Sequence, residues 1–409
     1  MYIKSLELKN IGPFDSGKLE FAYDPSDPGG HPVTIITGVN GAGKSIVIDA
    51  IRAALSGQEL ERNIVADEDD FFIKMNVELN GKSLRLSTSK FEGNHIKEAD
   101  FIEIGKYFKY KYDKSDKIQP WVVDYWSSRM PSDSFSVSSI GNIVHEEVLH
   151  NVLLGKKSNV ELTKFLCHID YLRSSDVPAE KELGEFIYNA VKQTINSCLD
   201  NGSFKYIRRT DLQPIIEQNG HEITLEKLSS GNIFLIEHLV LLICKMYSLS
   251  VLLNIPTADI LKSRGLLLID EIETHLHPRW QKSVLPIIRS LFPNLQIILT
   301  THSPFVLSSL PGVRIYTCKP RPGHSEIVDE TDVYSNLPVD EILLSDVFNV
   351  SPFNNDITKL MEERKAAIRE GKNEKVENIE SELTKINPEY FSYMSDIDKE
   401  LDRLADSIK

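Results

Sequence analysis

Residues 38–45 read GVNGAGKS and match the pattern GxxxxGK[ST] of phosphate-binding loops. An apolar segment at residues 33–36 comes directly before the loop. An amphipathic segment with apolar Ile46, Ile48, Ile51 and Leu55 follows it. A strand, a glycine-rich turn and a helix in this order let backbone N–H groups and the positive end of the helix surround a phosphate. We therefore expect a strand–loop–helix unit that holds a phosphorylated ligand.

Two residues of this loop carry chemistry beyond the backbone. The ammonium group of Lys44 is expected to neutralise charge on the β- and γ-phosphates of a nucleotide. The hydroxyl of Ser45 is expected to coordinate Mg²⁺. ATP and Mg²⁺ are thus the expected ligands of the loop.

A second stretch, residues 266–271, reads LLLIDE and predicts a buried strand that ends in two acidic residues. An apolar strand is also expected at residues 296–299, with a helix at residues 278–291 between the two, which makes a βαβ unit. Ligands bind outside the carboxyl ends of strands in α/β sheets, where both acids would lie. Asp270 is expected to hold Mg²⁺, and Glu271 is expected to act as the general base toward an attacking water.

Two further motifs are candidates for contacts with the nucleotide. Residues 300–304, TTHSP, follow the strand at residues 296–299, so His302 is a candidate contact of the γ-phosphate and the water. Residues 228–232, LSSGN, precede a long helix expected at residues 232–252. Ser229 is interpreted as the N-cap of this helix, whose N-terminus can also bind an anion.

Taken in this order, the four motifs resemble the ABC ATPase head, with its Walker A loop, signature, Walker B strand with catalytic glutamate, and switch histidine. The chain is similar, more narrowly, to the SMC/RecF-like branch and its OLD-family and anti-phage-defence relatives. The residues that carry this likeness are the opening segment Leu8–Phe14, the run Asp270–Gln281 and TTHSP. Val39 and Asn232 depart from the usual residues of the loop and of the signature.

The resemblance implies a head-to-tail dimer, in which the signature of one copy contacts the γ-phosphate held by the other. Glu271 and His302 are then catalytic, Ser45 and Asp270 hold Mg²⁺, and Gln119 is a candidate for the Q-loop glutamine. The expected ATP-binding residues are Gly38, Asn40, Gly41, Ala42, Gly43, Lys44, Ser45 and Ile46 of the loop, and Ser229, Ser230 and Gly231 of the signature.

The expected fold is α/β, an ABC ATPase head with a parallel sheet core and an antiparallel β subdomain. Residues 1–158 are expected to form the first lobe, and residues 159–224 a mainly helical insertion. Residues 225–337 are expected to form the second lobe, and residues 338–409 a helical C-terminal tail with charged faces.

Composition bounds the class of protein. The chain has 409 residues, 41% hydrophobic and 26% charged, which is ordinary for a globular protein. Its four cysteines have no metal-ligand spacing, the N-terminus has no apolar signal segment, and the stretch at residues 233–244 is too short and polar to span a bilayer. We expect a cytoplasmic protein without a membrane partner. The net charge of −14 argues only weakly against nucleic acid as a ligand.

Two functions stay open at this point. In the first, the chain is a regulatory ATPase of an anti-phage defence system that controls a separate effector nuclease, as in Septu and retron systems. In the second, it is a DNA-binding ATPase of repair or maintenance. The run of lysines and aromatic residues at 106–117 would serve the second function, although a hairpin with a solvated lysine face explains it as well. The run Glu271, Glu273, His275, His277 could mimic a zinc site. No nuclease site of the chain's own is evident.

Overall fold

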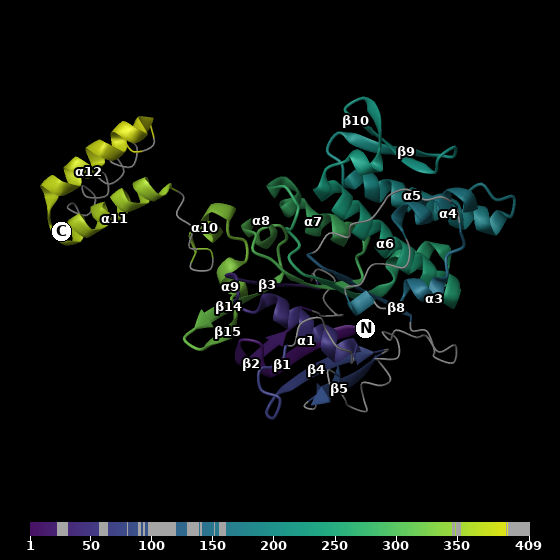
Figure 1. The fold of residues 1–409 in the computed structure, drawn as a ribbon, viewed down its shortest axis with the longest axis horizontal. Coiled ribbons are helices and arrows are strands. Elements are labelled where there is room, and N and C mark those ends of the chain that lie inside the picture. The colour runs from purple at the N-terminus through teal and green to yellow at the C-terminus, as the bar shows by residue number, and fades with distance from the viewer. Residues whose placement is uncertain are drawn as a thin grey trace. The chain divides into compact units, whose positions relative to one another are not determined.

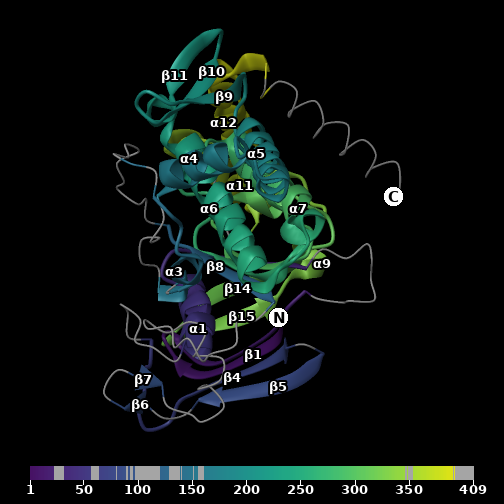
Figure 2. The same ribbon diagram turned by 90° about the vertical axis from the view of Figure 1, so that its right-hand side faces the viewer.

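The computed structural model describes residues 1–22, 32–56, 64–79, 81–88, 91–92, 95–96, 120–128, 139, 141–150, 152–154, 161–345, 348, 353–389 and 391. The chain divides into two compact units, Met1–Ile342 and Leu343–Lys409. Within the first unit, two sheets are separated by a helix, and a group of helices covers the far side of the larger sheet (Figures 1 and 2).

The larger, central sheet has six strands in the order β15-β14-β3-β13-β12-β8. All neighbours are parallel except β14 and β15, which form an antiparallel hairpin. The strands at its centre are buried along almost their whole length, as parallel strands covered on both faces must be. The six strands are β3 (Val33–Gly38), β8 (Trp121–Trp126), β12 (Arg264–Ile269), β13 (Leu295–Thr300), β14 (Arg314–Arg321) and β15 (His324–Asp329).

The smaller sheet is antiparallel, in the order β2-β1-β4-β5. Helix α1 (Lys44–Ser56) packs between this sheet and the central one and contacts strands of both (Figure 2). One hydrophobic core therefore joins both sheets and the helix, with members such as Leu6, Val47 and Ile298. The strands are β1 (Tyr2–Ile11), β2 (Phe14–Glu20), β4 (Phe72–Leu79) and β5 (Lys82–Thr88), and a short pair β6 (Phe91–Glu92) and β7 (His95–Ile96) follows.

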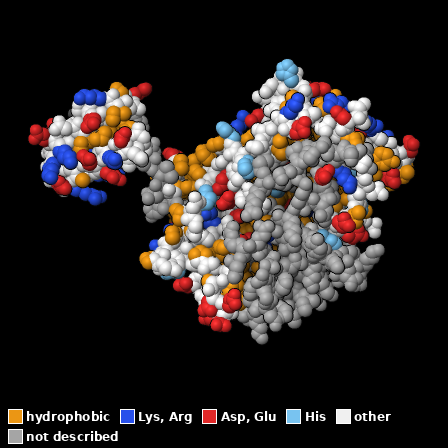
Figure 3. Space-filling view, in the orientation of Figure 1, with side chains coloured by type: hydrophobic (Ala, Val, Ile, Leu, Met, Phe, Trp, Pro, Cys, Tyr) orange, Lys and Arg blue, Asp and Glu red, His pale blue; other side chains and the backbone are white. Residues whose placement is uncertain are grey.

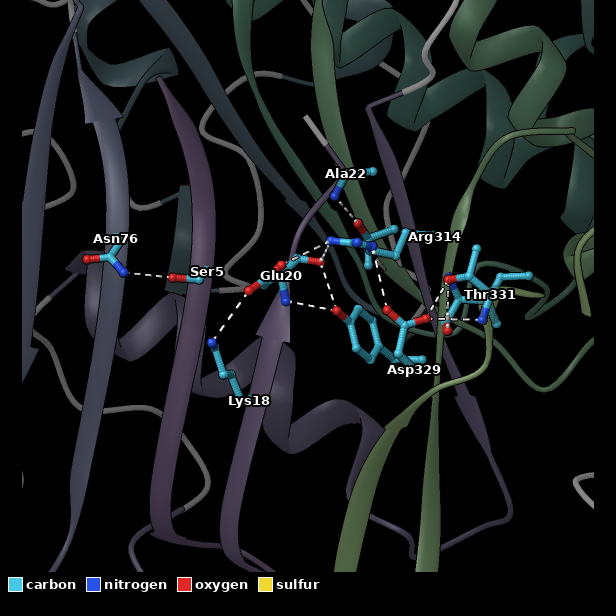
Figure 4. Close-up of polar contacts among 11 residues, drawn as sticks. Ser5, Lys18, Glu20, Ala22, Asn76, Arg314, Asp329 and Thr331 are labelled. Atoms are coloured by element: carbon cyan, nitrogen blue, oxygen red, sulfur yellow. Dashed lines mark hydrogen bonds and ion pairs between the residues drawn. The ribbon is translucent and has the colours of Figure 1, made fainter. Parts of the chain in front are cut away.

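A polar joint connects the edges of the two sheets (Figure 4). The Tyr316 hydroxyl on β14 donates to the carbonyl of Glu20 at the end of β2 at 3.0 Å and accepts from the Glu20 N–H at 2.9 Å. Arg314 lies beside the side chains of Glu20 and Asp329. The hairpin β14–β15 is thereby fixed against β2.

The remaining elements of the first unit are mostly helical. The insertion expected to be mainly helical ends in a three-stranded antiparallel sheet, in the order β11-β10-β9. The α-helices are α3 (His145–Val148), α4 (Leu162–Leu172), α5 (Pro178–Ser197), α6 (Ser230–Leu253), α7 (Pro278–Leu291), α8 (Pro304–Leu307), α9 (Thr331–Tyr334) and α10 (Val339–Leu344). The strands of the insertion are β9 (Gly202–Arg208), β10 (Gln213–Gln218) and β11 (His221–Thr224), and three 3₁₀ turns are η1 (Val152–Leu154), η2 (Leu225–Lys227) and η3 (Thr257–Lys262).

Helix α6 runs through the helical part of the first unit. Among the described residues it is the one helix with the length and apolar composition of a membrane span, and 78% of its apolar window is buried inside the protein. A buried ion pair between Lys245 of α6 and Asp124 of β8 ties it to the central sheet. Asp124 also accepts from the N–H of Tyr125 and from the indole of Trp126, which offsets the cost of burying its charge.

The second unit contains a helical hairpin of α11 (Asn355–Arg369) and α12 (Asn373–Ile386). Ile357, Leu360 and Met361 of α11 pack against Ile379 and Leu383 of α12, as the apolar stripes of these segments predict. Ile368 and Ile386 belong to the same expected stripes, but about half of each side chain is exposed. Figure 3 shows charges of both signs on the visible face of this unit.

Candidate nucleotide-binding site

The GVNGAGKS loop joins β3 to α1, and close contacts require two of its glycines. A Cβ atom on Gly38 would lie 2.3 Å from the carbonyl oxygen of Cys318 on the neighbouring strand β14. A Cβ atom on Gly43, whose φ is +100°, would lie 2.5 Å from the ring of Phe14. A side chain at position 38 would clash with Cys318, and one at position 43 would clash with Phe14, so either would displace the loop. The glycines thus fix where the loop lies as well as how it turns.

The opening segment Leu8–Phe14 supports this loop from the side of the smaller sheet. Phe14 and Pro13 contact Gly43, and Gly12 has no room for a Cβ beside Ile46, which would lie 2.7 Å away. The N–H of Ser325 on β15 donates to the carbonyl of Pro13 at 2.7 Å. The phosphate-binding loop therefore packs against the segment Leu8–Phe14, which carries part of the family resemblance.

Lys44 extends back over its own loop. Its Nζ donates to the carbonyl oxygen of Val39 at 3.0 Å. Burial lowers the pKa of Lys44, while Cys318 and the carboxylates of Glu271, Glu273 and Asp270 act in the opposite direction. The lysine is thus the cation of a mainly acidic site, and it lies within the loop where a phosphate would be held.

Ser45 and Asp270 meet although 225 positions separate them in the chain. The Ser45 hydroxyl donates to Oδ1 of Asp270 at 2.9 Å, and the Thr300 hydroxyl donates to the same oxygen at 2.6 Å. A hydroxyl and a carboxylate that converge in this way are the hard oxygen ligands that Mg²⁺ takes together with substrate phosphates. The residues present therefore fit a magnesium ion.

The chain turns sharply after β12. The N–H of Asp270 donates to the carbonyl of Trp126 at 2.9 Å, which ties the strand end to β8. Glu271 adopts φ +52°, a left-handed conformation that is uncommon for a residue with a side chain. Its N–H donates to the Thr300 hydroxyl at 2.8 Å. The Glu271 carboxylate, half-buried, is thus anchored through its backbone to the end of the adjacent strand β13.

His302 lies just after β13, close to the loop. Burial lowers its pKa to about 4, the charge of Lys44 acts in the same direction, and Asp270 and a hydrogen bond to the backbone of Gly38 act against it. The imidazole is accordingly neutral near pH 7. The ends of β3, β12 and β13 thus bring together the loop, Asp270, Glu271 and His302.

The LSSGN motif is positioned by other elements. Ser229 caps α6, where its side chain accepts from the N–H of Asn232, and both Ser229 and Ser230 are exposed. A Cβ on Gly231 would lie 2.5 Å from the carbonyl oxygen of His275, so glycine is required there by packing. Within the described part of the chain, no hydrogen bond joins residues 229–231 to residues 38–45. The two serines face solvent at the start of the helix, whereas Leu228, Gly231 and Asn232 are buried.

Other sequence expectations have different outcomes. Gln119 and the run at 106–117 lie outside the described residues. Among the residues that the structure describes, which include residues 271–277, no three His, Cys, Asp or Glu side chains gather as a metal site. Sequence reasoning missed Thr300 and Glu273, which contact the site residues directly. In the sequence, these two residues are marked only by their positions, Thr300 in the TTHSP motif and Glu273 in the run Asp270–Gln281.

The protonation state of His302 can be measured. In the nucleotide-free protein, the ring resonances of His302 should titrate with a midpoint near pH 4, because burial and Lys44 disfavour its charged form. Two-dimensional NMR of the histidine side chains reports this midpoint, and a His302→Asn variant assigns the signal. A midpoint near the ordinary value of about 6.5 would contradict the buried position described above.

Comparisons with known proteins identify the relatives of this chain. A family model described as an AAA domain matches residues 5–228, and a second, described as "AAA domain, putative AbiEii toxin, Type IV TA system", matches residues 199–308. The Retron Vc95 probable ATPase of Vibrio cholerae serotype O1 biovar El Tor is 25% identical over 386 residues, which cover 76% of this chain and 73% of that protein. The Septu protein PtuA of Bacillus thuringiensis is 23% identical over 333 residues, covering 76% of this chain and 74% of its own length.

Among solved structures, the SMC head domain from Thermotoga maritima aligns with a TM-score of 0.45 and 16% identity, covering 80% of this chain and 99% of its own. The first AAA-domain model spans more than half of the chain. The chain therefore belongs to this AAA-domain family, and it is similar to the probable ATPase of a retron and to a Septu protein.

Proposed function

We propose that the chain binds ATP and hydrolyses it at sites that two copies share, and that this cycle controls a separate effector nuclease. The observation that carries the proposal is the convergence of Lys44, Ser45, Asp270, Glu271 and His302 at the ends of three neighbouring strands. These groups supply a phosphate cradle, a cation, oxygen ligands and a carboxylate in one place. That set is what phosphoryl transfer to water requires.

In this proposal the loop residues 38–46 bind the triphosphate through their N–H groups, and Lys44 exchanges the Val39 carbonyl for phosphate oxygens. Ser45 and Asp270 would hold Mg²⁺, which when bound neutralises charge on the β- and γ-phosphates. Thr300 keeps Asp270 oriented through its 2.6 Å hydrogen bond. The carboxylate thus needs no rearrangement to face the loop.

Glu271 accepts the proton of the attacking water, because its carboxylate is the half-buried acid that follows Asp270 on the same strand end. His302 acts as a neutral hydrogen-bonding group toward the γ-phosphate and the water. A charged imidazole is disfavoured there by burial and by Lys44. The two side chains come from the ends of adjacent strands, so they approach the reacting atoms from neighbouring positions.

The shared site rests on the position of the signature. Ser229, Ser230 and Gly231 lie at the N-terminus of α6, a helix of 24 residues, where the backbone dipole favours an anion. Both serines are exposed, and Ser229 has its capping bond within α6. In a head-to-tail dimer, this end of α6 would complete the triphosphate site of the second copy, as the family resemblance implies.

Replacing Glu271 with Gln tests whether this residue acts in ATP hydrolysis and not in ATP binding. The variant should bind ATP as the wild type does, lose about 10²-fold or more in hydrolysis rate, and accumulate as an ATP-bound dimer, because only the proton acceptor is removed. Phosphate release and light scattering after gel filtration report the two effects. Glu185→Gln, on an exposed position of α5, is the matched control. A Glu271→Gln variant that stays monomeric with ATP would rule out the shared site.

The effector part of the proposal is supported by the likeness to a retron ATPase and a Septu protein. Purification of the tagged chain from its native host, with the neighbouring genes intact, should recover a nuclease whose activity differs between ATP and ADP. A chain that purifies alone, with ATP hydrolysis stimulated by DNA, would instead favour the DNA-maintenance function.

A further inference from the structure

The two groups proposed to act on the attacking water come from different loops. Glu271 belongs to the loop between β12 and α7, and His302 to the loop between β13 and α8. Their separation therefore depends on how firmly these loops hold each other. The N–H of Glu271 donates to the Thr300 hydroxyl and the N–H of Ile272 donates to the Thr300 carbonyl, which fixes the start of both loops. A second connection is needed beyond it, where His302 lies two residues further along.

Glu273 provides this second connection. Its Oε1 accepts from the backbone N–H of His302, and its Oε2 accepts from the Thr301 hydroxyl at 2.7 Å. Both carboxylate oxygens are thus used, and both point to the opposite loop. We propose that Glu273 is a positioning residue that holds His302 at a fixed place relative to Glu271 for ATP hydrolysis.

The neighbouring contacts extend this bridge. The Thr301 hydroxyl accepts from the N–H of Ser303 at 3.0 Å, and the Ser303 hydroxyl donates to Oε1 of Gln281 on α7 at 2.6 Å. Gln281 in turn donates to the carbonyl of Leu276 at 2.8 Å. The chain of hydrogen bonds therefore returns to the loop that carries Glu273. The two loops form one closed, hydrogen-bonded unit, whose link to the backbone of His302 is Glu273.

The carboxylate is suited to this role. Burial raises the pKa of Glu273, and the hydrogen bonds from His302 and Thr301 act in the opposite direction. A partly buried acceptor with two donors is costly to remove, because its loss leaves the N–H of His302 and the Thr301 hydroxyl without this partner. The geometry of the loops is therefore strongly specified at this point.

The inference rests on the proposed ATP hydrolysis and makes a separate prediction. Glu273→Ala should lower kcat by about tenfold or more while KM for ATP changes by less than about twofold, since positioning affects the reacting groups and not the phosphate cradle. Glu273→Gln should recover part of the loss. Its amide oxygen can still accept from the His302 N–H, and its NH₂ can donate to the Thr301 hydroxyl.

A third variant keeps the inference testable if Glu273→Ala does not fold. Thr301→Val keeps the shape of the side chain and removes its hydroxyl, which donates to Oε2 of Glu273 and accepts from the N–H of Ser303. The link from His302 to Oε1 is untouched, so the kcat of this variant should lie between the wild type and Glu273→Ala. Thermal unfolding and steady-state ATP hydrolysis are measured on all four proteins. If the Ala variant does not fold, the other three proteins test the inference. The wild type should then have a higher kcat than both Thr301→Val and Glu273→Gln, and equal kcat values for the three would overturn the inference.

Two further results would overturn it as well. A folded Glu273→Ala variant with wild-type kcat would show that His302 does not depend on this carboxylate. A Gln variant as slow as the Ala variant would show that the charge acts rather than the hydrogen bonds. Both results leave the proposed function standing, whereas a wild-type protein without ATP hydrolysis would remove the proposed function itself.

Discussion

The hydrogen bonds on Oδ1 of Asp270 are the interaction on which the site depends. Ser45 lies in the first turn of α1, Asp270 directly follows β12, and Thr300 ends β13, so one carboxylate oxygen joins three separate segments of the chain. Because Thr300 also accepts from the N–H of Glu271, the same junction orients the proposed general base. Any shift in the register between the neighbouring strands β12 and β13 would separate these groups.

The scaffold holds this junction by steric contact as much as by hydrogen bonds. Gly38 lies against β14, Gly43 lies against Phe14, and Gly265 of β12 has a Val122 carbonyl 1.9 Å from where its Cβ would be. Each contact allows a strand or a loop to approach its neighbour more closely than any side chain permits. The central sheet, the smaller sheet and the phosphate-binding loop are therefore positioned by the same few glycines.

The sequence predicted those parts of the fold whose signal is local. The helix at residues 278–291 has the expected bounds, and the buried strands that contain residues 33–36, 266–269 and 296–299 form the centre of the sheet. β8 was missed, because the buried Asp124 interrupts its apolar residues, so the segment shows neither a continuous apolar run nor an alternation. The strand β15 escaped prediction as well. It is stabilised by pairing with β14 and by its contacts with β2, which are not local signals.

The same limit applies to the site. Glycine-loop and strand-end residues follow from motif spacing, whereas the roles of Thr300 and Glu273 arise from contacts between loops that follow different strands. The motif that includes Gly231 was recognised, but the reason for glycine at this position, the carbonyl of His275, is visible only in three dimensions. Patterns indicate which residues carry chemistry. Tertiary structure determines which residues hold them in place.

The central claim, a triphosphate site shared by two copies, is tested most directly by mixing two inactive variants. Lys44→Ala removes the cation of the loop, and Ser229→Arg blocks the signature at its exposed end. In a head-to-tail dimer, a mixed pair has one site with both groups intact, so an equal mixture should recover about a quarter of the wild-type ATP hydrolysis. A mixture no more active than its two components, or a Ser229→Arg protein that hydrolyses ATP at the wild-type rate by itself, would contradict the account.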